Sequence, residues 1–235
     1  MKLLCLILGF SFAVHAKVFD QWGVNPYISF TKSVAPRYDL TILHWDVLTL
    51  GERNFQGRAY PRDWVQTYFQ TALTFKYNSS WNFAIGHVYQ MNNPNRDDYQ
   101  NEHRIFPQVT YASSWRSTRF TQRLRVEERF VQDREKDVYH ARTRVRFQTG
   151  MQFPLQGRTL DPGEYYFNTY NEFYFSALGE RNAFWSDDWV YTGLGFQTKD
   201  WGRIEAGPIA QFSVVNRDKD IRQLTVLQVG WLLSL

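Results

Sequence analysis

Arginine and glutamate alternate with apolar residues in the segment TQRLRVEERF, at positions 121–130. The charged residues at every second position are Arg123, Arg125, Glu127 and Arg129. These side chains can form ion pairs, because a planar guanidinium donates to two carboxylates at once in fixed geometry. A β-strand sends alternate side chains to opposite faces, so the spacing predicts a strand with one charged face and one apolar face.

Three other segments carry charges with the same period of two. Glu102 and Arg104 lie in 100–112, a run of arginines lies in 138–153, and Glu172 lies in 164–177. Together the four segments predict an ion-pair ladder across neighbouring strands. Its members are Glu102, Arg104, Arg123, Arg125, Glu127, Arg129, Arg142, Arg144, Arg146 and Glu172.

The turns between these segments predict which charges meet. A turn near 115 puts Glu102 opposite Arg129 and Arg104 opposite Glu127. A loop near 135 puts Glu127 within one register step of Arg142 and Arg144. From the other side, Glu172 comes close to Arg144 or Arg146.

Catalytic and metal-binding chemistry has less support. A hydrolase or acyltransferase of the membrane needs a serine beside an oriented histidine, and His44, His87, His103 and His140 lie in no serine-bearing motif. The acidic pairs at 97–98 and 187–188 match no calcium loop. We therefore expect no enzymatic activity, no catalytic residue, no metal site and no cofactor.

The first sixteen residues predict export. Lys2 precedes an almost wholly apolar run from Leu3 to Ala13, and small residues before Lys17 suit cleavage after Ala16. The mature chain, 17–235, then contains no cysteine, because Cys5 is the only one. Removing Lys2 lowers the 27 basic residues to 26, against 23 acidic ones, so the charge gives no reason to expect a nucleic-acid partner.

The elements that must position the ladder are long strands. Turn residues separate ten strand-like segments, near 38–53, 63–77, 81–92, 100–112, 118–132, 138–153, 164–177, 188–198, 202–215 and 221–234. Many exceed the usual 5–6 residues of a soluble strand and match the roughly 9–11 of a tilted membrane strand. Aromatic residues make up 18% of the chain, as the girdles of an outer-membrane barrel require.

These features predict one all-β domain, an antiparallel transmembrane barrel of the bacterial outer membrane. We expect about ten strands, or twelve if residues 19–30 join the wall. Most long and short connections alternate, which places the long loops outside and the short turns and the C-terminus in the periplasm, although the connection 154–163 is long for a periplasmic turn. The tryptophans at 22, 64, 81, 115, 185, 189 and 201 fall mostly near strand ends, as a girdle would.

The last strand predicts a route of assembly. Leu227, Val229, Trp231 and Leu233 share one face, similar to the C-terminal signal by which such barrels are recognised for insertion. Expected partners are therefore the barrel-assembly machinery, through this strand, together with outer-membrane lipid and lipopolysaccharide. We expect a monomer.

The predicted lumen is narrow and positive. With Asp46, Arg203 and Glu205 added to the ladder, eight arginines face five carboxylates. A barrel of about ten strands is only slightly wider than one that side chains fill, and uncompensated charges need water or anions beside them.

The segments NEHRIFPQVTY (101–111), RLRVEERF (123–130), RTRVRF (142–147), NEFYF (171–175) and GLGF (193–196) follow one another in an order that resembles a bacterial outer-membrane family, domain of unknown function 2490. The resemblance covers nearly all of the mature chain, and the Arg/Glu-alternating pair is its most specific part. It implies an outer-membrane barrel and assigns no activity.

Three functions are compatible with these features. The first is a structural barrel of the envelope with an occluded lumen, the second is a narrow anion-preferring channel, and the third, with the least support, is a lipid-modifying enzyme.

Overall fold

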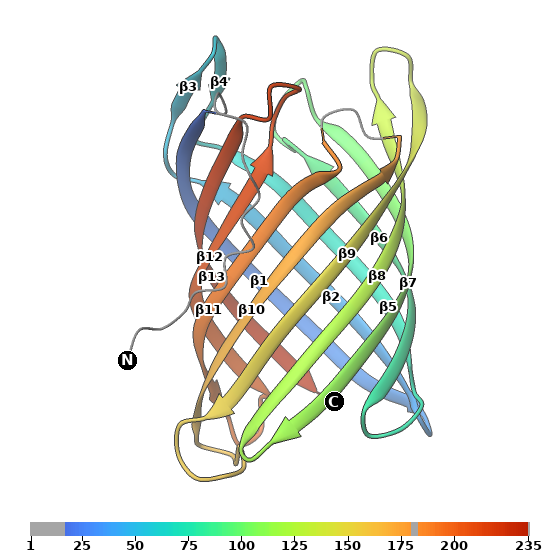
Figure 1. Ribbon diagram of the computed structural model, residues 1–235, viewed down its shortest axis with the longest axis vertical. Helices are drawn as coiled ribbons and strands as arrows, with labels where there is room; N and C mark the ends of the chain where they lie inside the picture. The colour runs from blue at the N-terminus through green and yellow to red at the C-terminus, as the bar shows by residue number, and fades with distance from the viewer. Residues whose placement is uncertain (1–16, 180–182, 235) are drawn as a thin grey trace.

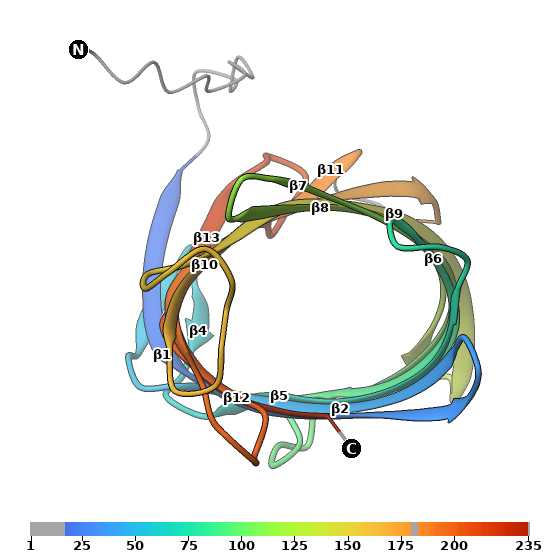
Figure 2. The same cartoon turned by 90° about the horizontal axis from the view of Figure 1, so that it is seen from below.

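Eleven strands form a closed barrel in the computed structural model, which describes residues 17–179 and 183–234 (Figures 1 and 2). The predicted signal peptide, with Cys5 and the Ala16 cleavage position, lies outside the described residues. The wall strands are β1 (Val18–Ala35), β2 (Tyr38–Thr49), β5 (Trp64–Lys76), β6 (Trp81–Asn92), β7 (Gln100–Trp115), β8 (Thr118–Asp133), β9 (Val138–Pro154), β10 (Tyr165–Leu178), β11 (Trp185–Gln197), β12 (Arg203–Val214) and β13 (Ile221–Ser234).

The number of strands differs from both predicted values, ten and twelve. Residues 18–35 form one strand, β1, which pairs with β2 in the antiparallel sense and with β13 in the parallel sense. The parallel pair runs from Val18 beside Ile221 to Thr31 beside Ser234. Antiparallel neighbours alone would close the ring only with an even number of strands, whereas one parallel seam allows an odd number.

The two ends of the barrel differ. One end, here called the loop end, carries the hairpin of β3 (Arg53–Phe55) and β4 (Arg58–Tyr60), the loops 93–99, 134–137 and 215–220, the end of β10, and the start of β1 (Figure 1). The other end, the turn end, carries the turns at 36–37 and 116–117, the connections 77–80, 155–164 and 198–202, and the end of β13. The predicted strand 38–53 is therefore too long, because the wall strand stops at Thr49 and the β3–β4 hairpin follows.

The wall is a single layer of tilted strands, and no other helix or strand of the described residues covers its outer face (Figure 2). Alternate residues of each strand point inward, as the period of two predicts. On β13, for example, Leu224 and Val226 are buried, whereas Leu227 and Val229 are exposed. No helix in the described part of the chain is long and apolar enough to cross a membrane.

Inward-facing glycines make room for aromatic rings inside the barrel. A Cβ atom on Gly195 would collide with the Tyr166 ring, and one on Gly230 would collide with the Tyr27 ring. Gly193 of the same GLGF segment lies in the same way against Tyr191. The glycines of this segment are thus explained by packing, since only a residue without a side chain lets a ring lie flat on the strand.

Candidate functional site

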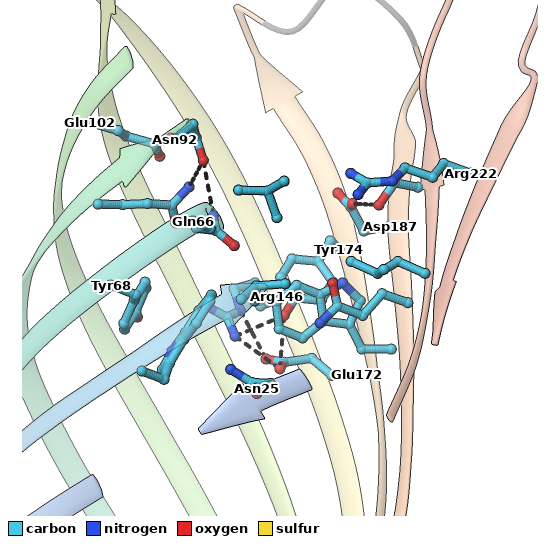
Figure 3. A pocket seen from close by; sticks show the side chains of 18 of the residues that line it. Asn25, Gln66, Tyr68, Asn92, Glu102, Arg146, Glu172, Tyr174, Asp187 and Arg222 are labelled. Atoms are coloured by element: carbon cyan, nitrogen blue, oxygen red, sulfur yellow. Dashed lines mark hydrogen bonds and ion pairs between the residues drawn. The ribbon is translucent and has the colours of Figure 1, made fainter. Parts of the chain in front are cut away.

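The predicted ladder lies on strands β7, β8, β9 and β10, which are neighbours in the barrel. Its residues occupy even positions on β7, β9 and β10 and odd positions on β8. These are the positions that face a cavity of about 1080 Å³ inside the barrel (Figure 3). Strand alternation thus brings charges from four separate segments onto one inner surface.

Glu127 is at the centre of the ladder and is fully buried. Its Oε2 accepts hydrogen bonds from Arg144, at 2.7 Å from Nη2 and 3.0 Å from Nε. Its Oε1 accepts one from Nη1 of Arg146 at 2.7 Å. The guanidiniums of Arg125 and Arg104 lie farther away, at 3.6 and 3.8 Å. One carboxylate therefore lies among four arginines.

Glu102 and Glu172 extend the ladder to either side. Glu102 accepts hydrogen bonds from Nε of Arg104 at 2.5 Å and from Nε of Arg129 at 2.6 Å. Glu172 accepts from Nη2 of Arg123 at 2.6 Å and, through both of its oxygens, from Arg146 at 2.9 Å (Figure 3). Because Arg146 binds Glu127 and Glu172 together, and Arg104 lies between Glu102 and Glu127, the three carboxylates form one connected network.

Arg142 is the tenth predicted member. It pairs in register with Arg129 across β8 and β9 and lines the cavity on the loop-end side of Arg144. The ladder thus extends toward the loop end with two arginines side by side.

The register between β7 and β8 differs from the predicted one by two residues. Glu102 lies opposite Val131, and Arg104 lies opposite Arg129, because the turn is centred on 116–117 rather than near 115. The ion pair between Glu102 and Arg129 forms all the same, since the long arginine side chain reaches diagonally across the strands. On the β8–β9 side Glu127 lies directly opposite Arg144, within the predicted step.

Neutral amides complete the arginine contacts. The inward position of Gln108 was predicted with the polar face of 100–112, whereas Gln70 and Gln90 were not predicted. Arg125 donates to the Gln108 side chain at 2.6 and 2.9 Å and to the Gln70 side chain at 3.0 Å. Arg104 donates to Gln90 at 2.5 Å. These amides occupy inward positions of β5, β6 and β7, a signal that the alternation of those strands contained. Gln70 and Gln90 lie on strands without alternating charges, so a pattern of charges did not mark them.

Aromatic rings cover the guanidinium faces. The Arg125 guanidinium lies 3.8 Å from the centre of the Phe106 ring, and that of Arg146 lies 4.6 Å from the Tyr174 ring. The Tyr174 hydroxyl also donates to Glu172 at 3.1 Å. Such cation–π contacts are stronger where water is excluded, so the rings stabilise the charged network.

The opposite part of the cavity is mainly aromatic. Trp45 on β2 stacks on Tyr68 with ring centres 4.6 Å apart and meets Trp189 on β11 edge to face at 6.4 Å. Trp189 in turn packs on Tyr174 at 5.0 Å. These contacts join the β2–β5 side of the wall to the β10–β11 side, so side chains bridge the interior there.

A second carboxylate centre lies on β12. Glu205 accepts hydrogen bonds from the Tyr166 hydroxyl at 2.6 Å, from Asn168 at 3.2 Å and from the Tyr27 hydroxyl at 3.4 Å. Its partners are neutral, whereas the three ladder carboxylates have guanidinium partners. Glu205 was added to the predicted lumen without these tyrosines, whose hydroxyls cannot be placed without the fold.

The cavity has a positive excess among the described residues. Its carboxylates are Asp98, Glu102, Glu172, Asp187 and Glu205, with Glu127 directly behind the surface. Its arginines are Arg58, Arg96, Arg104, Arg123, Arg125, Arg129, Arg142, Arg144, Arg146 and Arg222. Ten guanidiniums against six carboxylates leave four positive charges in excess.

Asp46 and Trp189 do not lie on the strand faces that the sequence predicted for them. Asp46 is on the outer face of β2, where it accepts hydrogen bonds from Trp64 and contacts His44, because Trp45 and Val47 take the inward positions. Trp189, counted with the girdle, faces the cavity and packs on Trp45 and Tyr174. In both cases the assumed strand face was wrong by one residue, which reverses the direction of a side chain.

In the part of the chain that is described, the polar contacts of the histidines are with aspartate or with another histidine, and none is with a serine hydroxyl. His44 contacts Asp46 at 3.1 Å, His87 contacts His103 at 3.4 Å, and His140 lies 3.5 Å from Asp133. The described part of the chain contains no group of three or more histidine, cysteine or acidic side chains arranged to hold a metal ion.

The family model for "Protein of unknown function (DUF2490)" matches residues 28–222, from the middle of β1 to the beginning of β13. The chain belongs to the DUF2490 family. All ten ladder residues lie within the DUF2490 match, as do the aromatic residues on the opposite side of the cavity. No curated protein and no solved structure matches the chain.

Proposed function

We propose that this DUF2490 protein is a bacterial outer-membrane barrel whose role in the envelope is structural, with its interior held shut by the ion-pair ladder. The observation that carries the proposal is the contrast between the two faces of the wall. Charged and amide side chains face the cavity, whereas large apolar side chains of the described strands are exposed on the outer face. We assign it no enzymatic activity.

The outer face suits contact with lipid. Exposed apolar residues on it include Phe69, Leu73, Phe83, Ile85, Ile105, Leu124, Val126, Phe147, Val190, Leu194 and Leu227. They come from strands around the ring, including β5, β6, β7, β8, β9, β11 and β13. Proteins surrounded by water rarely expose so large a continuous apolar surface.

Aromatic residues mark the two borders of this apolar surface. At the turn end Trp81, Trp115, Tyr165, Trp201 and Trp231 are exposed, and at the loop end Trp22, Tyr139 and Phe184 are exposed. Tryptophan and tyrosine concentrate where a bilayer meets water. The arrangement supports a barrel embedded between two aromatic girdles.

The orientation follows from the connections. A bacterial barrel has its short turns and its C-terminus in the periplasm and its longer loops outside. The two-residue turns 36–37 and 116–117 and the end of β13 support a periplasmic turn end, whereas the long connection 155–164 does not. Lipopolysaccharide then surrounds the loop end. The exposed face of Leu227, Val229 and Trp231 on β13 is available to the barrel-assembly machinery.

Occlusion is supported by contacts that cross the interior. Arg125 on β8 reaches Gln70 on β5, three strands away, and Trp45 on β2 meets Trp189 on β11. Such bridges obstruct the interior, which suits a barrel that stabilises the envelope.

Cell fractionation tests the location. We expect the protein in the outer-membrane fraction, with a band that migrates differently in detergent gels before and after heating. Recovery as a soluble periplasmic protein would overturn the proposal.

A substitution on the outer face tests contact with lipid directly. Ile85 lies midway along β6 and is 59% exposed, so in water Ile85→Arg should change the free energy of unfolding by less than about 0.5 kcal/mol. Facing the middle of a bilayer, the same change should cost about 2–4 kcal/mol. Urea unfolding in lipid vesicles measures the difference, with Leu155→Arg in the turn-end connection 155–164 as the matched control. Equal, small effects at both positions would contradict the membrane assignment.

A narrow anion-preferring channel is the second candidate, and the excess of guanidiniums favours it. Arg222 donates its Nε to Gln21 at 3.0 Å. In the described residues neither Arg222 nor Arg58 has a carboxylate within 4.0 Å, and both line the cavity beside the Tyr60 ring. Fixed positive charge attracts anions and repels cations.

A further inference from the structure

The beginning of β1 is bound to the loop that precedes β13. The backbone nitrogen of Lys17 donates a hydrogen bond to Oδ1 of Asp220 at 2.7 Å. The backbone nitrogen of Ile221 donates in return to the carbonyl oxygen of Lys17 at 2.9 Å. This contact lies at the loop end of the parallel β1–β13 seam, at its first rung.

Asp220 is held in place by its own loop. Asn216 donates from Nδ2 to Oδ2 of Asp220 at 2.8 Å and accepts from the Asp220 backbone nitrogen at 3.0 Å. Asp220 is only 1% exposed, although its loop lies at the rim of the barrel. Hydrogen bonds from the Lys17 backbone and from Asn216 lower the pKa of the Asp220 carboxyl below its ordinary value.

The partners of this carboxylate are neutral. In the part of the chain that the structure describes, no lysine, arginine or histidine nitrogen lies within 4.0 Å of Asp220. A covered, ionised carboxylate prefers a cationic donor, because charge-assisted hydrogen bonds are roughly twice as strong as neutral ones. The backbone nitrogen of Lys17 already donates to Asp220, so it would be a cationic donor if it carried a positive charge.

We propose that Lys17 is the first residue of the mature chain and that Asp220 binds its α-ammonium. The inference rests on export, as in the proposed function. A signal peptidase would hydrolyse the Ala16–Lys17 peptide bond: water adds across the broken C–N bond, a carboxylate stays on Ala16, and the amine left on Lys17 takes up a proton. The amide hydrogen bond to Asp220 thereby becomes an ion pair at the same place.

The position gives the ion pair a role in closing the barrel. Parallel pairing is slightly weaker per residue than antiparallel pairing, and strand ends fray first. A charged clasp at the first rung holds β1 against β13, the one seam whose strands are far apart in sequence. Processing then adds an ion pair at the end of a seam that, in the unprocessed chain, has only neutral hydrogen bonds at this rung.

The first test is to measure the mature N-terminus by mass spectrometry of the protein purified from membranes, which should begin at Lys17. The second compares stability in urea for Asp220→Asn and for a chain with one glycine inserted between Ala16 and Lys17. The insertion moves the amine by about 3.3 Å along the strand and leaves the 215–220 loop intact. Asp218→Asn, at an exposed position of the same loop, is the matched control.

Both Asp220→Asn and the glycine insertion should lower the ratio of folded to unfolded protein by about two- to fivefold near pH 7, the range of an exposed or rim ion pair. Asp218→Asn should leave the ratio unchanged.

The pH dependence separates an ion pair from a merely structural aspartate. The α-amine of an unfolded chain has a pKa of about 7.7–8.0, and a carboxylate partner favours its charged form. The extra stability is therefore present below about pH 8 and lost as pH rises beyond it. Other charged groups lie on the segments around Asp220. They are the Lys17 side chain, just before β1, and Asp20 on β1; Arg217, Asp218 and Lys219 on the 215–220 loop; and Arg53 and Arg58 on the β3–β4 hairpin. The glycine-inserted chain shares all of them, so their titration cancels in the comparison.

Convergence of the wild type and the inserted chain above pH 9 supports the clasp. A mature chain that begins elsewhere, or an identical pH profile for the two chains, overturns it. Cleavage before Lys17 in a protein that fractionates as soluble would leave the clasp standing and overturn only the membrane location.

Discussion

Replacing Glu127 by alanine is expected to lower the free energy of unfolding by about 3 kcal/mol. Glu127 is fully buried, and its oxygens accept hydrogen bonds from Arg144 and Arg146 at 2.7 Å. Arg104 and Arg125 lie within 4 Å of the same carboxylate. Alanine takes away the carboxylate that Arg144 and Arg125 contact, whereas Arg104 and Arg146 keep Glu102 and Glu172. Water in the adjoining cavity solvates part of this charge, so the loss falls at the lower end of the range for broken buried pairs.

Glu128→Ala is the matched control for this prediction. Glu128 follows Glu127 in the chain but lies on the outer face, opposite Ile105, where it accepts a hydrogen bond from Thr143 at 2.8 Å. Its removal breaks one hydrogen bond, so the expected loss is below about 1 kcal/mol. Urea unfolding followed by tryptophan fluorescence measures both variants. Equal losses of unfolding free energy in the two variants would show that the inward and outward faces of β8 are assigned wrongly.

The strands and their faces could be predicted because their signal is local. Every second residue from Arg123 to Arg129 is charged, and a period of two fixes both the secondary structure and the inward side of β8. Where charge does not alternate, the same reasoning failed. In HWD, at 44–46, the polar pair His44 and Asp46 faces outward and Trp45 faces the cavity, since a wide barrel also buries aromatic residues.

Register depends on the turn, which the sequence located to within one residue. Moving the centre of the β7–β8 turn by one position moves the pairing by two residues, and an even shift keeps every side chain on its own face. The charged side chains therefore face inward as predicted, although Glu102 lies opposite Val131 and not opposite Arg129. The length of the arginine side chain restored the Glu102–Arg129 contact.

Contacts across the interior could not be predicted from any single strand. The bridge from Arg125 to Gln70 and the Trp45–Trp189 contact depend on the curvature of the closed wall. The parallel seam between β1 and β13 also requires the first and last strands to meet. Nothing local in residues 19–30 distinguishes a strand that closes a ring in parallel from a further antiparallel pair.

The double variant Arg125→Ser and Arg144→Ser is expected to convert a closed or barely conducting barrel into a conducting one. Arg125 bridges the interior to Gln70 and Gln108, and Arg144 lies over the Tyr174 ring while it binds Glu127. Serine removes two long side chains and two positive charges. Conductance should therefore rise, and the preference for anions should fall.

Planar-bilayer recording of the wild type, the double variant and a control measures this effect. The control, Arg116→Ser with Arg134→Ser, removes two exposed arginines from the connections outside the wall, so its current should match that of the wild type. Silence in the wild type with opening in the double variant supports the occluded structural barrel. Small anion-selective events in the wild type favour the channel instead. Large cation-selective events in the wild type would contradict both, because a cavity with four excess guanidiniums cannot prefer cations.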